Sequence, residues 1–246
     1  MLHHTVEGTG SSRVVLVHGF TQTGRTWDDV AAHLAGDAEV VRVDLPGHGG
    51  SADVRLDFEK TAAALGDAGG PATYVGYSMG GRLCLRLALD RPHLVSALVL
   101  LGASPGVADA GERAERRHAD LRLALDIEDI GTDEFLHHWL GQPMFETLVP
   151  RPADMEARRA NRPDGLAAAL RSLGTGYQEP LWDRLPRLDM PVLLVVGSED
   201  AKFVGIAERM KTAIGDNARV VVLPGAGHAV HLDRPQECAD LVKGVF

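Results

Sequence analysis

The feature that most constrains the fold is the pentapeptide GYSMG at 76–80, which stands between an apolar run at 73–75 and a helical pattern at 79–89. In this setting the chain must turn sharply from a buried strand into a helix, and a side chain at either outer glycine would collide with neighbouring backbone. The serine is then held in a strained, exposed position with the positive end of the helix behind it. The pattern predicts a strand–turn–helix unit that presents Ser78 as a reactive group.

Short apolar runs rich in Val and Leu recur along the chain and are bounded by Gly, Pro or Asp. They lie at 13–17, 40–43, 73–75, 97–101, 192–196 and 219–223. Strands that are buried on both faces have this composition, and parallel sheets bury both faces. Helical patterns lie between or after these runs at 26–34, 79–89, 206–214 and 234–242. The alternation predicts an α/β fold with a mostly parallel sheet and helices on both faces.

The alternation stops between about residues 105 and 185, where no convincing strand is found. Helical periodicity continues there, at 110–125, 132–140, 152–159 and 165–173. We expect a core of residues 1–104 and 186–246 and an inserted helical cap of residues 105–185 over the carboxyl ends of the strands. Ligands bind at that edge in open α/β sheets. The alternative is that these are a few extra surface helices.

Composition and charge limit the class of protein and its partners. Hydrophobic residues make up 45% of the chain and charged residues 24%, as in soluble globular proteins. The formal charge of −9 disfavours nucleic acid and anionic membranes as partners. The start of the chain lacks a secretory signal, the longest apolar run is far shorter than the roughly 20 residues that span a bilayer, and the two cysteines form no disulfide framework. We expect a cytoplasmic protein without membrane insertion, either a monomer or a homo-oligomer.

A reactive serine needs a base, and the base needs an acid that orients it. His228 follows the last strand-like run in a glycine-rich loop, and Asp200 follows the run before it. Both positions fall at the sheet edge that carries Ser78, in the chain order of serine, acid and histidine. Asp200 is favoured over the adjacent Glu199. His228 is favoured over His231, which we expect in the helix after the loop.

Two further expectations concern metals and backbone donors. The spacing of His228 and His231 would suit a metal, but the sequence offers no third ligand, so we predict neither a metal nor another cofactor. An oxyanion in the site needs two donors. The N–H of Met79, directly after the serine, would be one. The N–H of Phe20, in the loop after the first apolar run, would be the other.

The chain resembles the α/β-hydrolase superfamily in four motifs that occur in order. They are HGF at 18–20, DLPGHGGS at 44–51, GYSMGG at 76–81 and GAGH at 225–228. The resemblance covers nearly the whole chain except the cap. It implies an α/β-hydrolase fold with an inserted helical cap, but it leaves the reaction open because that fold hosts many chemistries.

Arg82 narrows the choice of reaction. It lies one helical turn after Ser78 and can share the same face of the helix. A cation in the first turn opposes the helix dipole, and an isolated buried charge is worse. We therefore expect an anionic ligand beside Arg82. The alternative is that the side chain reaches solvent.

The cap adds a narrower resemblance, to the 2-succinyl-6-hydroxy-2,4-cyclohexadiene-1-carboxylate synthases of menaquinone biosynthesis. The matching segments are GYSMGGR at 76–82, SPG at 104–106 with the paired arginines after it, WLGQPMF at 139–145, GLAAALRSLGTG at 165–176 and DAKF at 200–203. The resemblance implies a triad of Ser78, Asp200 and His228, oxyanion donors at Phe20 and Met79, and a substrate site lined by Tyr77, Arg82, Arg116 and Trp139. A further cap arginine of the family matches Arg159, with Arg158 and Arg162 as alternatives.

The same resemblance implies a small polycarboxylate substrate, for which guanidinium groups are suited because they bind carboxylates bidentately. The implied activity is that of a carbon–oxygen lyase. It eliminates pyruvate from 2-succinyl-5-enolpyruvyl-6-hydroxy-3-cyclohexene-1-carboxylate to give 2-succinyl-6-hydroxy-2,4-cyclohexadiene-1-carboxylate, with the triad making Ser78 a general base. One alternative is a serine-triad carboxylesterase or carbon–carbon bond hydrolase of the same fold. Another is a binding protein, which would have no need of the triad.

Overall fold

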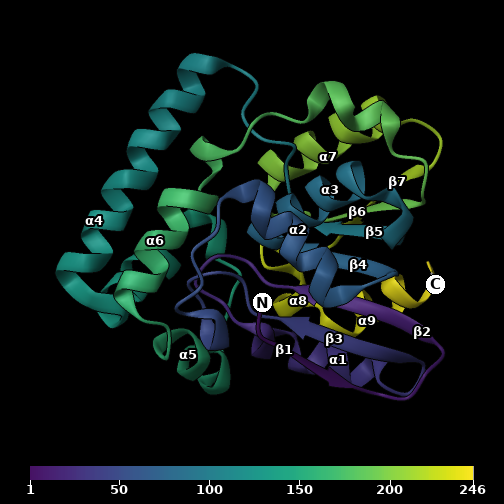
Figure 1. Ribbon diagram of the computed structural model, residues 1–246, viewed down its shortest axis with the longest axis horizontal. Coiled ribbons are helices and arrows are strands. Elements are labelled where there is room, and N and C mark those ends of the chain that lie inside the picture. The colour runs from purple at the N-terminus through teal and green to yellow at the C-terminus, as the bar shows by residue number, and fades with distance from the viewer. Residues whose placement is uncertain (246) are drawn as a thin grey trace.

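The computed structural model describes residues 1–245, which build a seven-stranded sheet in the order β1-β3-β2-β4-β5-β6-β7 (Figure 1). The strands are β1 (His4–Glu7), β2 (Ser12–Val17), β3 (Ala38–Val43), β4 (Ala72–Tyr77), β5 (Val95–Leu101), β6 (Val192–Gly197) and β7 (Ala218–Leu223). Every neighbouring pair is parallel except β1 with β3, which is antiparallel at one edge. The predicted mostly parallel sheet is confirmed.

Helices cover both faces of this sheet, as the alternation of strands and helices predicts. On one face lie α2 (Phe58–Gly69), α3 (Met79–Asp90) and α7 (Ala201–Ile214). On the other lie α1 (Asp28–Leu34), α8 (Val230–Asp233) and α9 (Pro235–Lys243). Strand β2 shows how the sheet serves two cores: Val15 and Val17 pack into the first, and Val14 and Leu16 into the second. Successive side chains of a strand point to opposite faces, so both sets must be apolar.

Between β5 and β6 the chain forms α4 (Ala110–Leu140), α5 (Pro152–Arg159) and α6 (Pro163–Leu173), with no strand among the described residues of this segment. Figure 1 shows α4 and α6 side by side at one end of the sheet, with α5 below them in this view. A small core of their own holds α4 and α6 together, through Ala124, Ile127, Phe135, Leu166 and Leu170 among others. The helical insertion is therefore present. Its division from the core at residues 104 and 186 stays a prediction.

Helix α4 is interrupted at Gly131, whose φ of 78° and ψ of 171° are non-helical, so the two helical stretches expected at 110–125 and 132–140 lie on either side of this break. Strand β1 and helix α2 were not predicted from the sequence.

Within residues 1–245 no helix is both long and apolar enough to cross a membrane. Cys84 and Cys238 are both free and buried.

Candidate active site

Ser78 occupies the turn between β4 and α3, as the pentapeptide predicts. Its backbone has φ 49° and ψ −109°, a conformation that residues other than glycine rarely adopt. The flanking glycines are sterically required. A Cβ at Gly76 would lie 2.6 Å from the Cα of Gly81, and one at Gly80 would collide with the carbonyl of Val17. The strand and helix therefore approach closely enough to hold the serine at the tip of the turn.

A hydrogen-bonded chain connects this serine to a histidine and an aspartate. His228 Nε2 lies 3.3 Å from Ser78 Oγ, and His228 Nδ1 lies 2.7 Å from Asp200 Oδ2. The Nδ1–H donates to the carboxylate, which leaves Nε2 free to accept the hydroxyl proton. His228 is only 2% exposed, and the ring of Phe203, 4.6 Å away, packs against it. The arrangement can remove a proton from Ser78 and stabilise the imidazolium that forms.

The two alternatives that the sequence left open lie elsewhere. Glu199 is exposed and accepts a hydrogen bond of 2.8 Å from the Ser198 hydroxyl. His231 lies in α8, as expected, where its buried ring packs 4.4 Å from the rings of Trp27 and Tyr77. Burial, with Arg158 nearby, lowers the pKa of His231 well below its ordinary value. The structure thus brings Asp200 and His228 to the serine.

The two expected oxyanion donors flank the serine. Phe20 follows β2 and Met79 follows Ser78, and both line the cavity above the triad. Within residues 1–245, neither backbone N–H donates a hydrogen bond. The loop that carries Phe20 is fixed on either side, because Gly19 N–H donates to Gln22 Oε1 at 3.0 Å and Gln22 N–H donates to Gly19 O at 3.2 Å. Free, fixed N–H groups can stabilise a developing negative charge on oxygen.

The loop at 44–51 supports the Phe20 loop through two buried histidines. His18 Nε2 accepts the N–H of Leu45 at 3.0 Å, and His48 Nε2 accepts the N–H of Thr21 at 3.3 Å. Each ring donates its Nδ1–H to a backbone carbonyl, so both imidazoles are neutral. Burial lowers the pKa of His18 and lowers that of His48 to about 3. These rings hold loops in place and stay uncharged.

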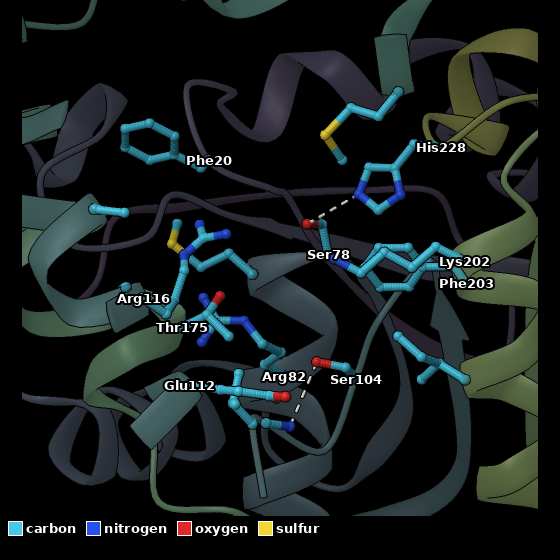
Figure 2. Close-up of a pocket in the computed structure, with 18 of the residues that line it drawn as sticks. Phe20, Ser78, Arg82, Ser104, Glu112, Arg116, Thr175, Lys202, Phe203 and His228 are labelled. Atoms are coloured by element: carbon cyan, nitrogen blue, oxygen red, sulfur yellow. Dashed lines mark hydrogen bonds between the residues drawn. The ribbon is translucent and has the colours of Figure 1, made fainter. Parts of the chain in front are cut away.

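A cavity of about 890 Å³ opens over Ser78 and His228. Residues from the ends of β2, β4, β5 and β7 line it on the core side, and α4 and α6 line it on the other, so it lies at the carboxyl edge of the parallel strands. Four basic side chains line it, Arg82, Arg116, Lys202 and Arg209, against two acidic ones, Asp109 and Glu112. Figure 2 shows Arg82, Arg116, Lys202 and Glu112 around Ser78 and His228. The cavity is therefore basic in a chain whose formal charge is −9.

Arg82 is the most constrained of these cations. It is 6% exposed, and it donates to Gln178 Oε1 at 2.9 Å and to the carbonyl of Leu173 at 2.7 Å. Both partners are neutral, and among residues 1–245 Arg82 forms no ion pair, because Asp120, the acidic group that acts on it, is paired with Arg116. Burial, and then the positive charge of Arg116, lower the pKa of Arg82 to about 10, although Asp120 acts in the opposite direction. An anion in the cavity would satisfy this charge.

The other residues expected in the substrate site also line the cavity. Arg116 extends from α4 and pairs through Nε with Asp120 Oδ1 at 2.8 Å. Trp139 packs edge-on against Phe20, with ring centroids 5.3 Å apart, and its buried Nε1 has no hydrogen-bond partner among residues 1–245. The ring of Tyr77 packs against that of His228 with centroids 5.3 Å apart, and burial raises the pKa of the Tyr77 hydroxyl. The expected site residues that line this cavity are Phe20, Tyr77, Ser78, Met79, Arg82, Arg116, Trp139 and His228. Asp200 does not line it, because its carboxylate lies behind His228.

Arg159 is the exception, because it lies outside the cavity and not in the substrate site where it was expected. Its side chain is 57% exposed, pairs with Asp133 at 2.6 Å and does not line the cavity. Arg162 is also exposed and pairs with acidic residues on the surface. Arg158 is 2% exposed and donates to the Thr21 hydroxyl. Consecutive helical residues point about 100° apart, so only one of the pair at the end of α5 can point inward.

Two further cations of the cavity, Lys202 and Arg209, were not predicted as site residues from the sequence. Lys202 lies two residues after Asp200 at the start of α7, and Arg209 lies two turns further on, 4.5 Å above the ring of Trp182. The signal was the helical spacing after Asp200, which places both side chains on the face of α7 that borders the cavity. In residues 1–245, no three or more His, Cys, Asp or Glu side chains are grouped to hold a metal ion.

Comparisons with known proteins identify the family of this chain. The model of the alpha/beta hydrolase family matches residues 14–241. A Bacillus subtilis (strain 168) protein, provisionally named 2-succinyl-6-hydroxy-2,4-cyclohexadiene-1-carboxylate synthase, is 34% identical over 94% of this chain and 89% of its own. The synthase of that name from Salmonella typhimurium is 32% identical over 98% of this chain and 96% of its own. The structure of MenH from S. aureus superposes with a TM-score of 0.90 at 29% identity, covering 100% of this chain and 98% of that one. The chain belongs to the alpha/beta hydrolase family, in the group that includes the 2-succinyl-6-hydroxy-2,4-cyclohexadiene-1-carboxylate synthases.

Proposed function

We propose that the protein is a lyase that eliminates pyruvate from 2-succinyl-5-enolpyruvyl-6-hydroxy-3-cyclohexene-1-carboxylate. The observation that carries the proposal is the buried Arg82 guanidinium in the wall of the cavity, which has neutral hydrogen-bond partners and forms no ion pair among residues 1–245. The charge of Arg116 disfavours the charged form of Arg82, Asp120 offsets this only in part while it pairs with Arg116, and a ligand carboxylate beside the two arginines would favour the charged form. A substrate with three carboxylates matches a cavity that has four basic side chains.

The chemistry follows from the placement of the triad. His228, oriented by Asp200, takes the proton of Ser78, and Ser78 removes the proton alpha to the succinyl ketone. The electrons of the broken C–H bond form an enolate, whose oxygen the N–H groups of Phe20 and Met79 stabilise. They then move through the ring double bond and break the C–O bond of the enolpyruvyl ether. The leaving group departs as the enolate of pyruvate and takes up the proton held by His228, which gives pyruvate and restores the neutral imidazole.

A serine hydrolase remains the second candidate, because the same triad and donors also suit a covalent acyl-enzyme. The two activities differ in their use of water and in the charge of their substrates. A hydrolase adds one water to the substrate and has no need of paired arginines. An elimination consumes no water, and its polycarboxylate substrate needs them.

The test compares two substrates on one preparation of the protein. Pyruvate release from the enolpyruvyl substrate is followed with lactate dehydrogenase and NADH, and hydrolysis of a neutral aryl ester is followed by absorbance. We expect pyruvate release to exceed ester hydrolysis by at least about 10³-fold in kcat/KM. Rapid ester turnover with no pyruvate release would assign the protein to the hydrolases.

A further inference from the structure

Thr21, which directly follows Phe20, has an unusual backbone conformation. Its φ is 68°, and among residues 1–245 the only other non-glycine residue with a positive φ is Ser78. This conformation is disfavoured most for β-branched residues, and it persists only where the surroundings enforce it. Any relaxation at Thr21 would rotate the peptide chain next to it and move the N–H of Phe20. The surroundings of Thr21 therefore matter to the oxyanion site.

Three hydrogen bonds hold Thr21, and two of them come from the helical insertion. Its N–H donates to His48 Nε2 at 3.3 Å, within the core. Its carbonyl accepts from Asn161 Nδ2 at 2.9 Å, and its Oγ1 accepts from Arg158 Nη1. Arg158 and Asn161 lie at the end of α5 and just beyond it. Every polar group of Thr21 is thus engaged, and the insertion supplies the ties on the side-chain and carbonyl oxygens.

Burying Arg158 at this position costs free energy. It is 2% exposed, its Nε has no hydrogen-bond partner, and no carboxylate of residues 1–245 forms an ion pair with it. A buried cation without an ionic partner destabilises the fold, so its presence indicates a role other than stability. It does not line the cavity, so direct contact with a ligand there does not account for it. Its guanidinium donates to a neutral hydroxyl at the one strained position of the Phe20 loop.

We propose that Arg158, with Asn161, is a positioning residue that clamps Thr21 in its left-handed conformation and so fixes the Phe20 N–H for the oxyanion. Because both hydrogen-bond donors belong to the insertion, we expect the oxyanion site to be formed only when α5 is packed against the Phe20 loop. The proposal rests on the proposed function only in treating Phe20 as an oxyanion donor. It does not depend on the identity of the substrate.

The test measures the reactivity of Ser78 with a fluorophosphonate probe, which reports on the oxyanion site without the natural substrate. Ser78 Oγ bonds to phosphorus, the P–F bond breaks, fluoride leaves, and His228 takes the hydroxyl proton. Removing an oxyanion donor outright costs about 10²–10³-fold. We expect the smaller displacement in Arg158→Met to slow labelling by about 10- to 100-fold. Arg171→Met removes a half-exposed cation of α6 that pairs with Glu128 and does not line the cavity, and this matched control should label at the wild-type rate.

Two further variants separate positioning from a general loss of structure. Thr21→Val removes the hydroxyl acceptor with little change in volume and should slow labelling as Arg158→Met does. Asn adopts the left-handed conformation more readily than other non-glycine residues. Thr21→Asn in the Arg158→Met background should therefore recover at least about a third of the wild-type labelling rate. A residue that only stabilised the fold would show no such rescue.

The outcomes distinguish this proposal from the proposed function. Wild-type labelling rates in both Arg158→Met and Thr21→Val would overturn the clamp, whether or not the protein releases pyruvate. So would a raised KM for pyruvate release with unchanged kcat, because that would make Arg158 a substrate ligand. Slow labelling of the variants by a protein that releases no pyruvate would refute the lyase assignment and leave the clamp in place.

Discussion

Replacing Arg82 by methionine isolates the charge that faces the cavity. Methionine fills much of the same volume with apolar atoms, so the substitution removes the guanidinium without opening a large hole. A charge-assisted hydrogen bond to a ligand carboxylate contributes about 1.5–3 kcal/mol, which corresponds to roughly 10- to 150-fold in kcat/KM. We expect pyruvate elimination to fall by this factor. Turnover of a neutral aryl ester, which has no carboxylate, should change less than about threefold.

The effect on stability can be worked out from the same side chain. The fall in the pKa of Arg82 from 12.5 to about 10 represents a penalty of roughly 3 kcal/mol for keeping the buried guanidinium charged, at about 1.36 kcal/mol per pH unit. Removing the charge relieves this penalty. It also leaves Gln178 Oε1 and the Leu173 carbonyl without a donor, at about 1–3 kcal/mol each. The two effects largely cancel, so the free energy of unfolding should shift by less than about 3 kcal/mol.

Two assays and a denaturation curve decide the matter. Pyruvate release and ester hydrolysis are measured on wild type and on Arg82→Met, and urea unfolding is measured without ligand. Arg82→Lys should recover elimination only in part, because an ammonium group cannot form the planar fork. Equal losses on both substrates, accompanied by marked destabilisation, would show that Arg82 supports the fold and would refute the reasoning.

The remaining predictions concern the triad and the buried histidines. Ser78→Ala and His228→Ala should each lower kcat by roughly 10³–10⁶-fold, and the double variant should lose little more, because the pair acts as a unit; a Ser78→Ala protein with a tenth of wild-type turnover would be incompatible with this role. Asp200→Asn should lower kcat by about 10⁴-fold, whereas Glu199→Gln, at an exposed side chain, should change it less than about twofold, as steady-state kinetics would show. The pKa of His48 is lowered to about 3 in the folded protein, so below about pH 6.5 the unfolded chain binds a proton that the folded chain does not. The contribution of neutral His48 to stability is therefore complete above about pH 6.5. The free energy of unfolding falls by about 1.4 kcal/mol per pH unit from there toward pH 3. Urea unfolding between pH 7 and 4.5 should therefore be less steeply pH-dependent in His48→Gln; parallel curves would refute this linkage.

Much of the site could be predicted from sequence because its residues are fixed by local signals. Ser78 is specified by two glycines that no other residue can replace sterically. Asp200 follows the buried strand β6 and His228 lies in the loop after the edge strand β7, and parallel strands bring their carboxyl ends to one edge. The strongly apolar strands were found for the same reason. Most of them have the near-continuous apolar pattern that is typical of strands buried on both faces.

The missed elements lack such local signals. Strand β1 (His4–Glu7) has polar or half-exposed residues at both ends and is fixed by its antiparallel pairing with β3, a tertiary contact. Helix α2 (Phe58–Gly69) buries small residues such as Ala62 and Gly66, which give little hydrophobic contrast. The choice between Arg158 and Arg159 depends on the rotation of α5 against the core, which is set by packing and not by residue type.

Because the cavity is basic and the chain as a whole is acidic, the charges that act on a polyanion during its approach differ in sign from those that act on it inside the cavity. At distances beyond the cavity mouth, the formal charge of −9 repels an approaching polycarboxylate. Inside, Arg82, Arg116, Lys202 and Arg209 attract it. Salt screens exposed charges over roughly 8–10 Å at physiological ionic strength, and it screens partly enclosed pairs less. Moderate ionic strength therefore weakens the outer barrier more than the inner attraction, so encounter with a polyanion becomes faster as salt is added, the reverse of an enzyme whose whole surface steers its substrate.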